Sequence, residues 1–339
     1  VSPYVGRCVT GARGVVTAIL GQRRGQAFWM QDVVGDDTPE TSDGVLVTAL
    51  AGTNEIAVGD QIEVSGRIEE RSWGIELPVT RIVASHVDVQ GRGRPLPEAV
   101  SLGEGGVVIP RGEVASRRLR DYDPSRFAAD AFESLEGMRV RLGDAVVVGP
   151  TSRHGEFTVV ADGGRGSAPW TAAGGLRRTP CNVHPQRVIV DDRLVQDPPD
   201  VAVGDVFSEP IAGILHYSYG SYKLLNTEPL PKYSGVDSEG ERTALVGDVS
   251  HLTVATFNLE NLWAGSDAAK FASVAKVITE HLSNPDVLAV QEIQDDTGPE
   301  DDGTVSAAME GALYGHAAIA FSLAIVDNHR GGLSAADFE

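Results

Sequence analysis

Two polar residues, an amide and a carboxylate, stand at the ends of two apolar runs in the last third of the chain. Asn258 follows the β-branched run 253–257, and Glu292 comes shortly after the apolar run 286–290. If the runs are neighbouring parallel strands, both side chains emerge at the carboxyl edge of the sheet, where open α/β sheets bind ligands. A carboxylate there suits a hard cation such as Mg²⁺, and an amide can orient a phosphate. The spacing alone favours ordinary strand-end residues, because single carboxylates are common there.

The residues between the two runs predict the helix that would connect the strands. Ser266 or Asp267 can cap its first turn, and Asn284-Pro285 ends it, since the residue before proline avoids helical angles. Four apolar residues recur at helical spacing between these ends: Phe271, Val274, Ile278 and Leu282. The segment therefore predicts a strand–helix–strand crossover, which would place Asn258 and Glu292 side by side.

Thr256–Leu262 (TFNLENL) and Leu288–Asp295 (LAVQEIQD) resemble the opening of the DNase I-like endonuclease/exonuclease/phosphatase superfamily. The similarity is greatest to a branch of secreted bacterial nucleases, and Asp302–Ser306 (DGTVS) is similar to the next segment of that branch. The resemblance implies that Asn258 positions the scissile phosphate and the metal, and that Glu292 ligates Mg²⁺, or Mn²⁺ or Ca²⁺ in its place. It implies a secreted, metal-dependent phosphodiesterase, most simply a DNA endonuclease.

The resemblance covers only the beginning of that catalytic domain, which is a four-layered α/β sandwich longer than residues 251–339. The general-base histidine of the family and its aspartate partner come from later strands. His316 and His329 are the only histidines after Glu292, and neither has a recognisable catalytic context. We therefore expect little or no nuclease activity from this polypeptide, and activity from a full-length parent.

Composition sets limits on the partners. The 339 residues carry 48 Asp and Glu against 28 Lys and Arg, a net charge of −20. An acidic chain binds polyanions poorly unless it has a local basic surface, so nucleic-acid contacts must come from clustered arginines or a bridging metal. No run is long and apolar enough to cross a bilayer. Neither an initial methionine nor a signal peptide is present at Val1, which predicts a mature secreted product or a fragment.

Residues 1–97 predict a small OB-like β-barrel, because short strand-like runs alternate with turns and no long helix intervenes. The expected strands are residues 14–19, 27–32, 44–48, 59–68, 73–77 and 82–89. Alternation places Phe28 and Trp29 on opposite faces, and we assign Phe28 to the barrel core. OB-folds often bind single strands through stacked aromatics and basic groups. Trp29 and Trp73, with Arg71, are candidates for that role, and core packing is the alternative for both tryptophans.

Residues 98–130 predict a linker with an arginine patch at Arg117, Arg118 and Arg120, and residues 131–234 predict a second OB-like domain. Gly204-Asp205 echoes Gly59-Asp60, each preceded by Ala-Val, which indicates an internal repeat. Short sequence segments of this region, such as ESLEGM and GEFTVV, also resemble the same nuclease branch.

Tyr219 and Tyr222, beside Tyr217 and Lys223, form an aromatic–basic cluster that could contact nucleic acid. Packing within a β-hairpin is the alternative that we favour. Residues 235–250 predict a second linker, leading into the partial catalytic domain 251–339.

Three functions compete at this point. The first is a metal-dependent nuclease, with DNA favoured over RNA. The second is a non-catalytic OB-fold protein that binds nucleic acid. The third is a phosphatase or phospholipid phosphodiesterase of the same superfamily, which two OB-like domains make the less favoured choice.

Overall fold

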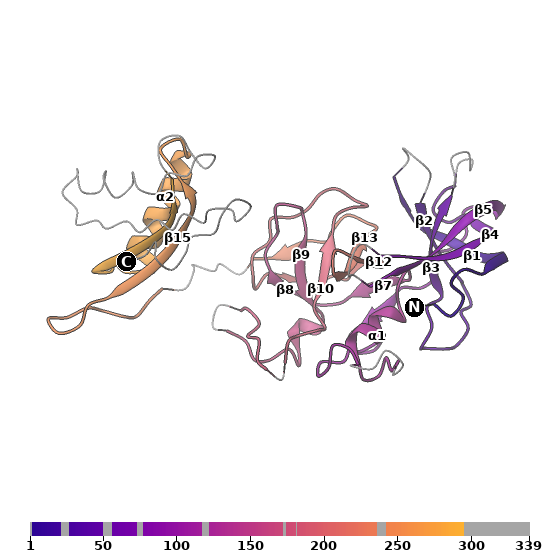
Figure 1. Ribbon diagram of the computed structural model, residues 1–339, viewed down its shortest axis with the longest axis horizontal. Coiled ribbons are helices and arrows are strands. Elements are labelled where there is room, and N and C mark those ends of the chain that lie inside the picture. The colour runs from indigo at the N-terminus through magenta and orange to yellow at the C-terminus, as the bar shows by residue number, and fades with distance from the viewer. Residues whose placement is uncertain are drawn as a thin grey trace, which may run out of the picture. The chain divides into compact units, whose positions relative to one another are not determined.

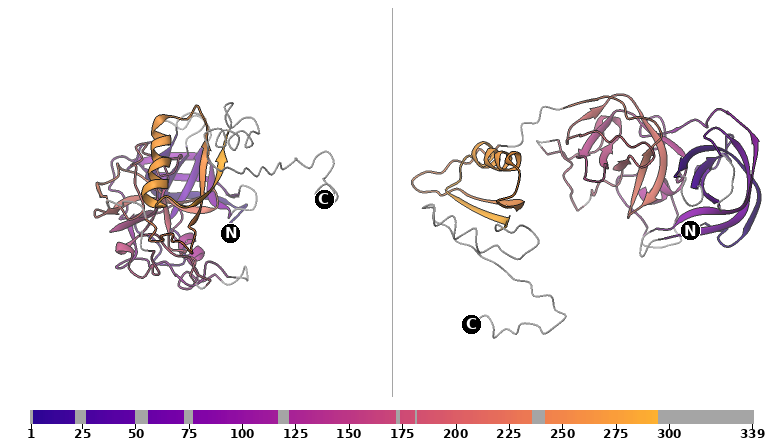
Figure 2. Two further views of the ribbon diagram at one scale, coloured as in Figure 1. Left: turned by 90° about the vertical axis from the view of Figure 1, so that its left-hand side faces the viewer. Right: turned by 90° about the horizontal axis from the view of Figure 1, so that it is seen from above.

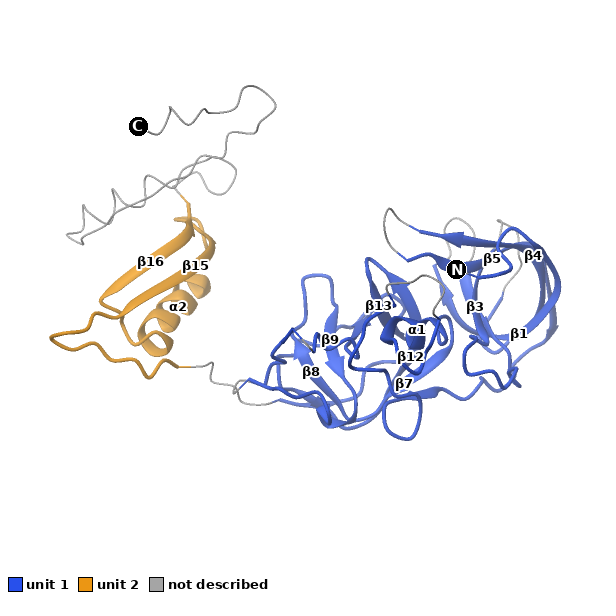
Figure 3. Cartoon of the chain, turned by 60° about the horizontal axis from the view of Figure 1, so that its bottom comes forward, with its two compact units in different colours: residues 1–238 blue, residues 239–339 orange. Residues whose placement is uncertain are grey.

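The protein divides into two compact units, Val1–Ser238 and Glu239–Glu339 (Figure 3). The computed structural model describes residues 2–21, 27–49, 56–72, 77–116, 122–171, 174–180, 182–235 and 242–294. The division falls inside the segment 235–250 that the sequence predicts as a linker. Within the described ranges, no helix is long and apolar enough to cross a membrane.

The first part of unit 1 is a closed five-stranded barrel (Figure 1). Its strands are β1 (Cys8–Leu20), β2 (Ala27–Gln31), β3 (Gly44–Ala49), β4 (Gln61–Arg71) and β5 (Val79–Gly91). They follow the order β1-β2-β3-β5-β4, and β1 closes the ring by pairing with both β2 and β4. A five-stranded Greek-key barrel with one long, shared first strand is the OB-fold.

Alternation along the strands decides what fills this barrel. Phe28, Ile62 and Val64 are fully buried in one cluster with their neighbours from β1, β3 and β5. Trp29, the next residue along β2, belongs to a different cluster on the outer face. The prediction that Phe28 and Trp29 face opposite ways, with Phe28 in the core, is therefore confirmed.

The rest of unit 1 is a nine-stranded sheet with two short helical segments. Its strand order is β14-β11-β8-β9-β10-β13-β12-β7-β6. The elements are β6 (Val100–Leu102), α1 (Ala128–Glu133), β7 (Arg139–Leu142), β8 (Ala145–Gly149), β9 (Phe157–Val160), η1 (Asp162–Gly164), β10 (Val188–Asp191), β11 (Val206–Phe207), β12 (Ile211–Ser218), β13 (Ser221–Asn226) and β14 (Tyr233–Ser234).

The strand pairing of this sheet follows the OB-type order. The strands β7 and β8 are separated only by Gly143 and Asp144, and together they correspond to one bent first strand. In the same way β11 and β12 form an interrupted fourth strand: β11 pairs with β8, and β12 pairs with β7. The remaining order, β9-β10-β13, has a parallel β10–β13 pair, as β3–β5 is parallel in the first barrel. Unit 1 therefore contains the two OB-like barrels that the sequence predicts.

The repeated Ala-Val-Gly-Asp sequence makes the same turn in both barrels. The buried Asp60 carboxylate accepts a hydrogen bond from the backbone N–H of Ala57 at 2.9 Å, and Asp205 accepts one from Ala202 at 2.9 Å. The glycine before each aspartate has a positive φ, and its N–H donates to a valine carbonyl of the first strand at 2.9 Å, Val16 in one barrel and Val147 in the other. The internal repeat is thus structural.

The predicted linker 98–130 is part of the second barrel rather than a spacer. Leu102, Ile109 and Ala128 are buried in the core of that barrel. Residues 100–102 form β6, which pairs with β7. The prediction was wrong because Gly, Pro and Arg are also common in segments that wrap a barrel. The arginine patch at 117–120 lies outside the described residues.

The described part of unit 2 is the predicted strand–helix–strand crossover (Figure 2). It consists of β15 (Val254–Leu262), α2 (Ala268–Lys276), the π-helical segment η2 (Val277–His281) and β16 (Val287–Ile293). β15 and β16 are parallel, and Asp267 caps α2 by accepting a hydrogen bond from the N–H of Lys270 at 2.6 Å. No side chain of α2 is buried, and Phe271 is exposed. The DNase I-like sandwich is not seen in the described residues.

Candidate functional site

The two residues predicted to share a sheet edge lie together in unit 2. Asn258 Nδ2 donates a hydrogen bond to Glu292 Oε1 at 2.8 Å. The register explains this pairing, because Asn258 lies opposite Gln291, next to Glu292, on parallel strands. Both side chains are exposed, so a ligand has access to them.

The backbone around the pair is irregular. Glu260, Asn261 and Glu292 have φ values of 53°, 57° and 53°, and the register shifts between Asn258 and Leu262. Such left-handed residues cost energy for side chains other than glycine, and bulges of this kind re-aim side chains beside functional sites. The backbone N–H of Glu260 donates to Asn258 Oδ1 at 2.8 Å. Both ends of the Asn258 amide are therefore engaged, which fixes its orientation.

Two further polar residues belong to this edge and were not predicted. Gln294 Nε2 donates to Asn261 Oδ1 at 2.7 Å; Asn261 lies within the irregular stretch of β15, and Gln294 follows the last residue of β16. The dense polar sequence after each apolar run was a usable signal, since an ordinary strand end needs one polar residue rather than several.

The donor chemistry of this edge fits a cation that takes few protein ligands. Glu292 offers a carboxylate and Asn258 an amide, and no cluster of three or more His, Cys, Asp or Glu side chains suited to a metal occurs among residues 2–294 where they are described. Mg²⁺ usually keeps several waters and binds through one or two carboxylates plus substrate phosphates. The residues present therefore fit Mg²⁺ and do not form a closed cage.

Trp29 is not a ligand contact, which corrects one prediction for the first barrel. It is 1% exposed and packs on Ile214 and Leu225 of the second barrel. Its ring also meets the edge of the His216 ring, with centroids 5.4 Å apart. Alternation correctly pointed Trp29 out of its own barrel, but the second barrel covers that face. Arg71 is exposed at the end of β4, and Trp73 lies outside the described residues.

Tyr222 is likewise a packing residue, which agrees with the alternative favoured from the sequence and not with a role in contacting nucleic acid. It is 9% exposed, stacks on Phe132 of α1 at 4.9 Å, and donates to Glu133 Oε2 at 2.8 Å. Tyr219 differs, because it is 82% exposed at the turn between β12 and β13. Lys223 lies 5.2 Å from the Tyr219 ring centroid, so this part of the predicted cluster is present and accessible.

Lys223 itself is unavailable to phosphates. The residue is 2% exposed, and Nζ forms ion pairs with Glu156 and, at 3.1 Å, with Asp191. Two carboxylates around one ammonium group leave this face acidic rather than basic. The cationic contacts required for nucleic acid must therefore lie elsewhere.

The junction between the two barrels contains a buried carboxyl group. Glu136 is 8% exposed, and burial raises its pKa to about 8, with the nearby carboxylates of Glu133 and Glu70 adding to the shift and a hydrogen bond from Thr80 opposing it. On the same junction, burial lowers the pKa of His216 to about 4. Both groups are therefore neutral in the folded protein near pH 6.

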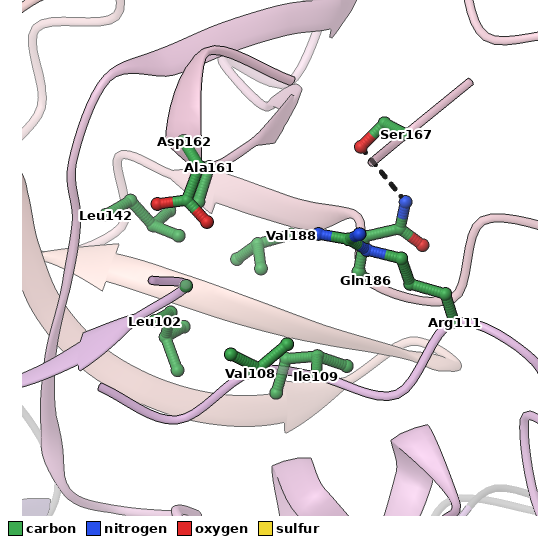
Figure 4. A pocket seen from close by; sticks show the side chains of 11 residues that line it. Leu102, Val108, Ile109, Arg111, Leu142, Ala161, Asp162, Ser167, Gln186 and Val188 are labelled. Carbon is green, nitrogen blue, oxygen red and sulfur yellow. Dashed lines mark hydrogen bonds between the residues drawn. The ribbon is translucent and has the colours of Figure 1, made fainter. Parts of the chain in front are cut away.

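A small pocket lies beside η1 in the second barrel (Figure 4). Leu102, Leu142 and Val188 form its apolar part. Its polar residues include Arg111 and Gln186, and the Gln186 amide donates to Ser167 Oγ at 3.1 Å. These polar groups tie segments of the barrel together.

Comparison with known proteins adds one family match. A family model described as a domain of unknown function, DUF8508, matches residues 91–234, which is less than half of the chain and covers the second barrel. No curated protein matches the chain.

Among solved structures, a deletion mutant of the single-stranded DNA binding protein from Thermus aquaticus is 16% identical, covering 68% of this chain and 99% of that one, with a TM-score of 0.19. The HINb domain of p204 is 12% identical, covering 63% and 91%, with a TM-score of 0.22. Fission yeast Pot1, solved with single-stranded DNA, is 12% identical, covering 69% and 86%, with a TM-score of 0.21. These TM-scores are too low to assign a fold or a function. The OB assignment rests on the strand pairing instead.

Proposed function

We propose that unit 1 is a nucleic-acid-binding module. The observation that supports this most is that one closed barrel and one nine-stranded sheet share the OB-type strand pairing and the same buried aspartate turn. OB-folds commonly present a face and loops to oligonucleotides. A fold allows a function without specifying it, so the module must also supply accessible contacts.

The charge of the chain shapes this proposal. At a net charge of −20, the protein as a whole repels polyanions. Binding must then be local and strongly weakened by salt, because each phosphate contact releases a condensed counterion. DNA is the first substrate to test, and RNA the second.

The test is fluorescence anisotropy of a labelled single-stranded DNA of about 20 nucleotides, titrated with the 339-residue chain at salt concentrations from about 50 to 200 mM. We expect binding at low salt that weakens steeply as salt rises, and the same strand as RNA gives the comparison. Failure of both strands to bind at the lowest salt would refute the proposal.

A second function is favoured by a separate observation, the hydrogen-bonded pair of Asn258 and Glu292 at the edge of β15 and β16. We infer that unit 2 contributes to a metal-dependent phosphodiesterase site. Glu292 would hold the cation, which when bound polarises a phosphoryl oxygen and neutralises its charge. Asn258, whose amide is already oriented by the Glu260 N–H, would hold the phosphate in place. The resemblance of both strand ends to secreted nucleases supports these roles.

Isothermal titration of Mg²⁺ and Mn²⁺ tests this second function. We expect weak binding to the protein alone, tighter binding with single-stranded DNA present, and loss of both in Glu292→Gln. Glu260→Gln is the matched control, because that exposed glutamate lies on the same edge. Equal binding by the parent and Glu292→Gln would remove Glu292 from the site. Coupling to inositol phosphate instead of DNA would favour the phosphatase alternative.

A further inference from the structure

One connection in the second barrel departs from the overall acidity of this chain. From Gly163 to Val190, between β9 and the end of β10, the sequence contains four arginines and neither Asp nor Glu. The arginines are Arg165, Arg177, Arg178 and Arg187. In a chain with a net charge of −20, this acid-free stretch is a local cationic segment, and we call it the arginine loop.

The arginine loop has defined internal structure. Two antiparallel bridges cross it, Trp170 with Leu176 and Thr179 with Asn182. The Arg177 N–H donates to the Pro169 carbonyl at 2.9 Å. These contacts describe the loop apart from residues 172, 173 and 181, which are outside the described ranges.

The buried His184 forms hydrogen bonds with two of the arginines, through the backbone carbonyl of Arg177 and the side chain of Arg187. His184 is fully buried with φ of 54°, and its Nε2 donates to the Arg177 carbonyl at 3.1 Å. Its own carbonyl accepts a hydrogen bond from Arg187 Nε at 3.0 Å. Arg177 and Arg187, ten residues apart in sequence, are therefore held on the same structural element.

The base of the arginine loop is fastened to the barrel beside the pocket of Figure 4. Gln186 donates to Ser167 Oγ, as Figure 4 shows. Arg111 Nη2 donates to the Arg165 carbonyl at 2.9 Å. A loop that is anchored at its base loses less conformational entropy when a ligand binds, so binding is more favourable.

The exposed arginines are available to an anion. Arg177, Arg178 and Arg187 are exposed, and no ion pair of Arg177 or Arg178 is found in the described parts of the chain. Arg165, by contrast, is paired with Glu104 at 3.2 Å. Guanidinium groups bind phosphates through two parallel hydrogen bonds, so they suit a phosphate backbone better than lysine does.

Acidic residues lie at both ends of β9 and β10. Glu156 precedes β9, Asp191 ends β10 and Asp192 follows it, while Asp162 lies at the end where the arginine loop begins. The space beside Gly155 confirms that the residues before β9 and after β10 lie close together, since a Cβ there would lie 2.8 Å from an Asp192 oxygen. The arginine loop joins the opposite ends of the two strands.

We propose that the arginine loop is the surface through which the second barrel holds the phosphates of a nucleic-acid strand, with Arg177 and Arg178 as direct contacts. The inference rests on the nucleic-acid-binding function proposed for unit 1 and gives that function a location. The outer face of β2 and β3 has no role in nucleic-acid binding in this proposal, because the second barrel covers that face.

The test compares Arg177→Gln/Arg178→Gln with Arg13→Gln/Arg126→Gln in the full chain, using the same labelled single-stranded DNA. The control removes the same two charges from side chains that are 76% and 61% exposed, on β1 and in the turn before α1. We expect the loop variant to bind about 10-fold more weakly at low salt, and its slope of log K against log salt to fall by about 1.4, since single strands lose about 0.7 per phosphate contact. The control should stay within about twofold of the parent.

The outcomes separate this inference from the function on which it rests. If the parent binds DNA and both variants bind equally well, or lose affinity equally, the arginine loop is refuted while nucleic-acid binding stands. If the parent does not bind, both are refuted. Displacement of DNA by inorganic polyphosphate at equal phosphate concentration would make the loop a general polyanion surface, and so overturn its assignment to nucleic acid.

Discussion

The two barrels of unit 1 share a ring and a turn but differ in what their outer surfaces contact. The outer face of β2 in the first barrel carries Trp29, and that face is buried against Ile214 and Leu225 of the second barrel. The β9–β10 connection of the second barrel instead contains four arginines, of which Arg177, Arg178 and Arg187 are exposed. The two barrels therefore share a strand order but differ in their outer side chains: those of one are covered, and those of the other include exposed arginines.

The interruptions in the second barrel follow from its sequence. Its first strand breaks at Gly143-Asp144, where Asp144 has φ of 44°, and its fourth strand breaks before Ile211, where Pro210 cannot donate to the ladder. The first barrel has continuous strands at both places. The connection between β9 and β10 is longer than the one between β2 and β3 in the first barrel, whereas the turn between β12 and β13 is shorter than the connection between β4 and β5.

Removing the Trp29 side chain should have the largest effect on the free energy of unfolding, because Trp29 forms the contact between the two barrels. We expect Trp29→Ala to lower the free energy of unfolding by about 3–5 kcal/mol, since a large buried ring leaves a cavity at the junction. Tyr219→Ala, at an exposed aromatic on the second barrel, should change it by less than about 0.5 kcal/mol. Urea unfolding followed by circular dichroism measures both. Similar small losses in the two variants would show that the barrels do not depend on the covered face.

The junction should also respond to pH through Glu136. Its pKa rises from 4.5 to about 8 on folding, so its contribution to stability is fully present below about pH 4.5 and is lost as the pH rises through about 8. We expect Glu136→Gln to be more stable than the parent by about 2–4 kcal/mol at pH 9, and nearly equal to it at pH 4.5. Glu113→Gln, at an exposed glutamate, is the control. A pH-independent difference between Glu136→Gln and the parent would contradict the buried-carboxyl interpretation.

The sequence alone determined the features that depend on local order. The alternation at Phe28 and Trp29, the repeated Ala-Val-Gly-Asp turn and the meeting of Asn258 with Glu292 all follow from strand periodicity or from the parallel crossover, which act over a few residues or one connection. The irregular backbone at Glu260 and Glu292 was not predictable, because left-handed conformations at glutamate have no reliable local signal.

Only the tertiary structure decided which of the side chains that point out of a barrel remain exposed to solvent. Trp29 and Tyr222 have the composition of a binding surface, yet one is covered by the second barrel and the other by α1. Residues 98–130 resemble a linker, yet they complete a core. Burial depends on which two surfaces meet, and segments far apart in the chain supply those surfaces. Strand periodicity predicts which face of the sheet a side chain lies on, but it does not predict whether another element packs against that face.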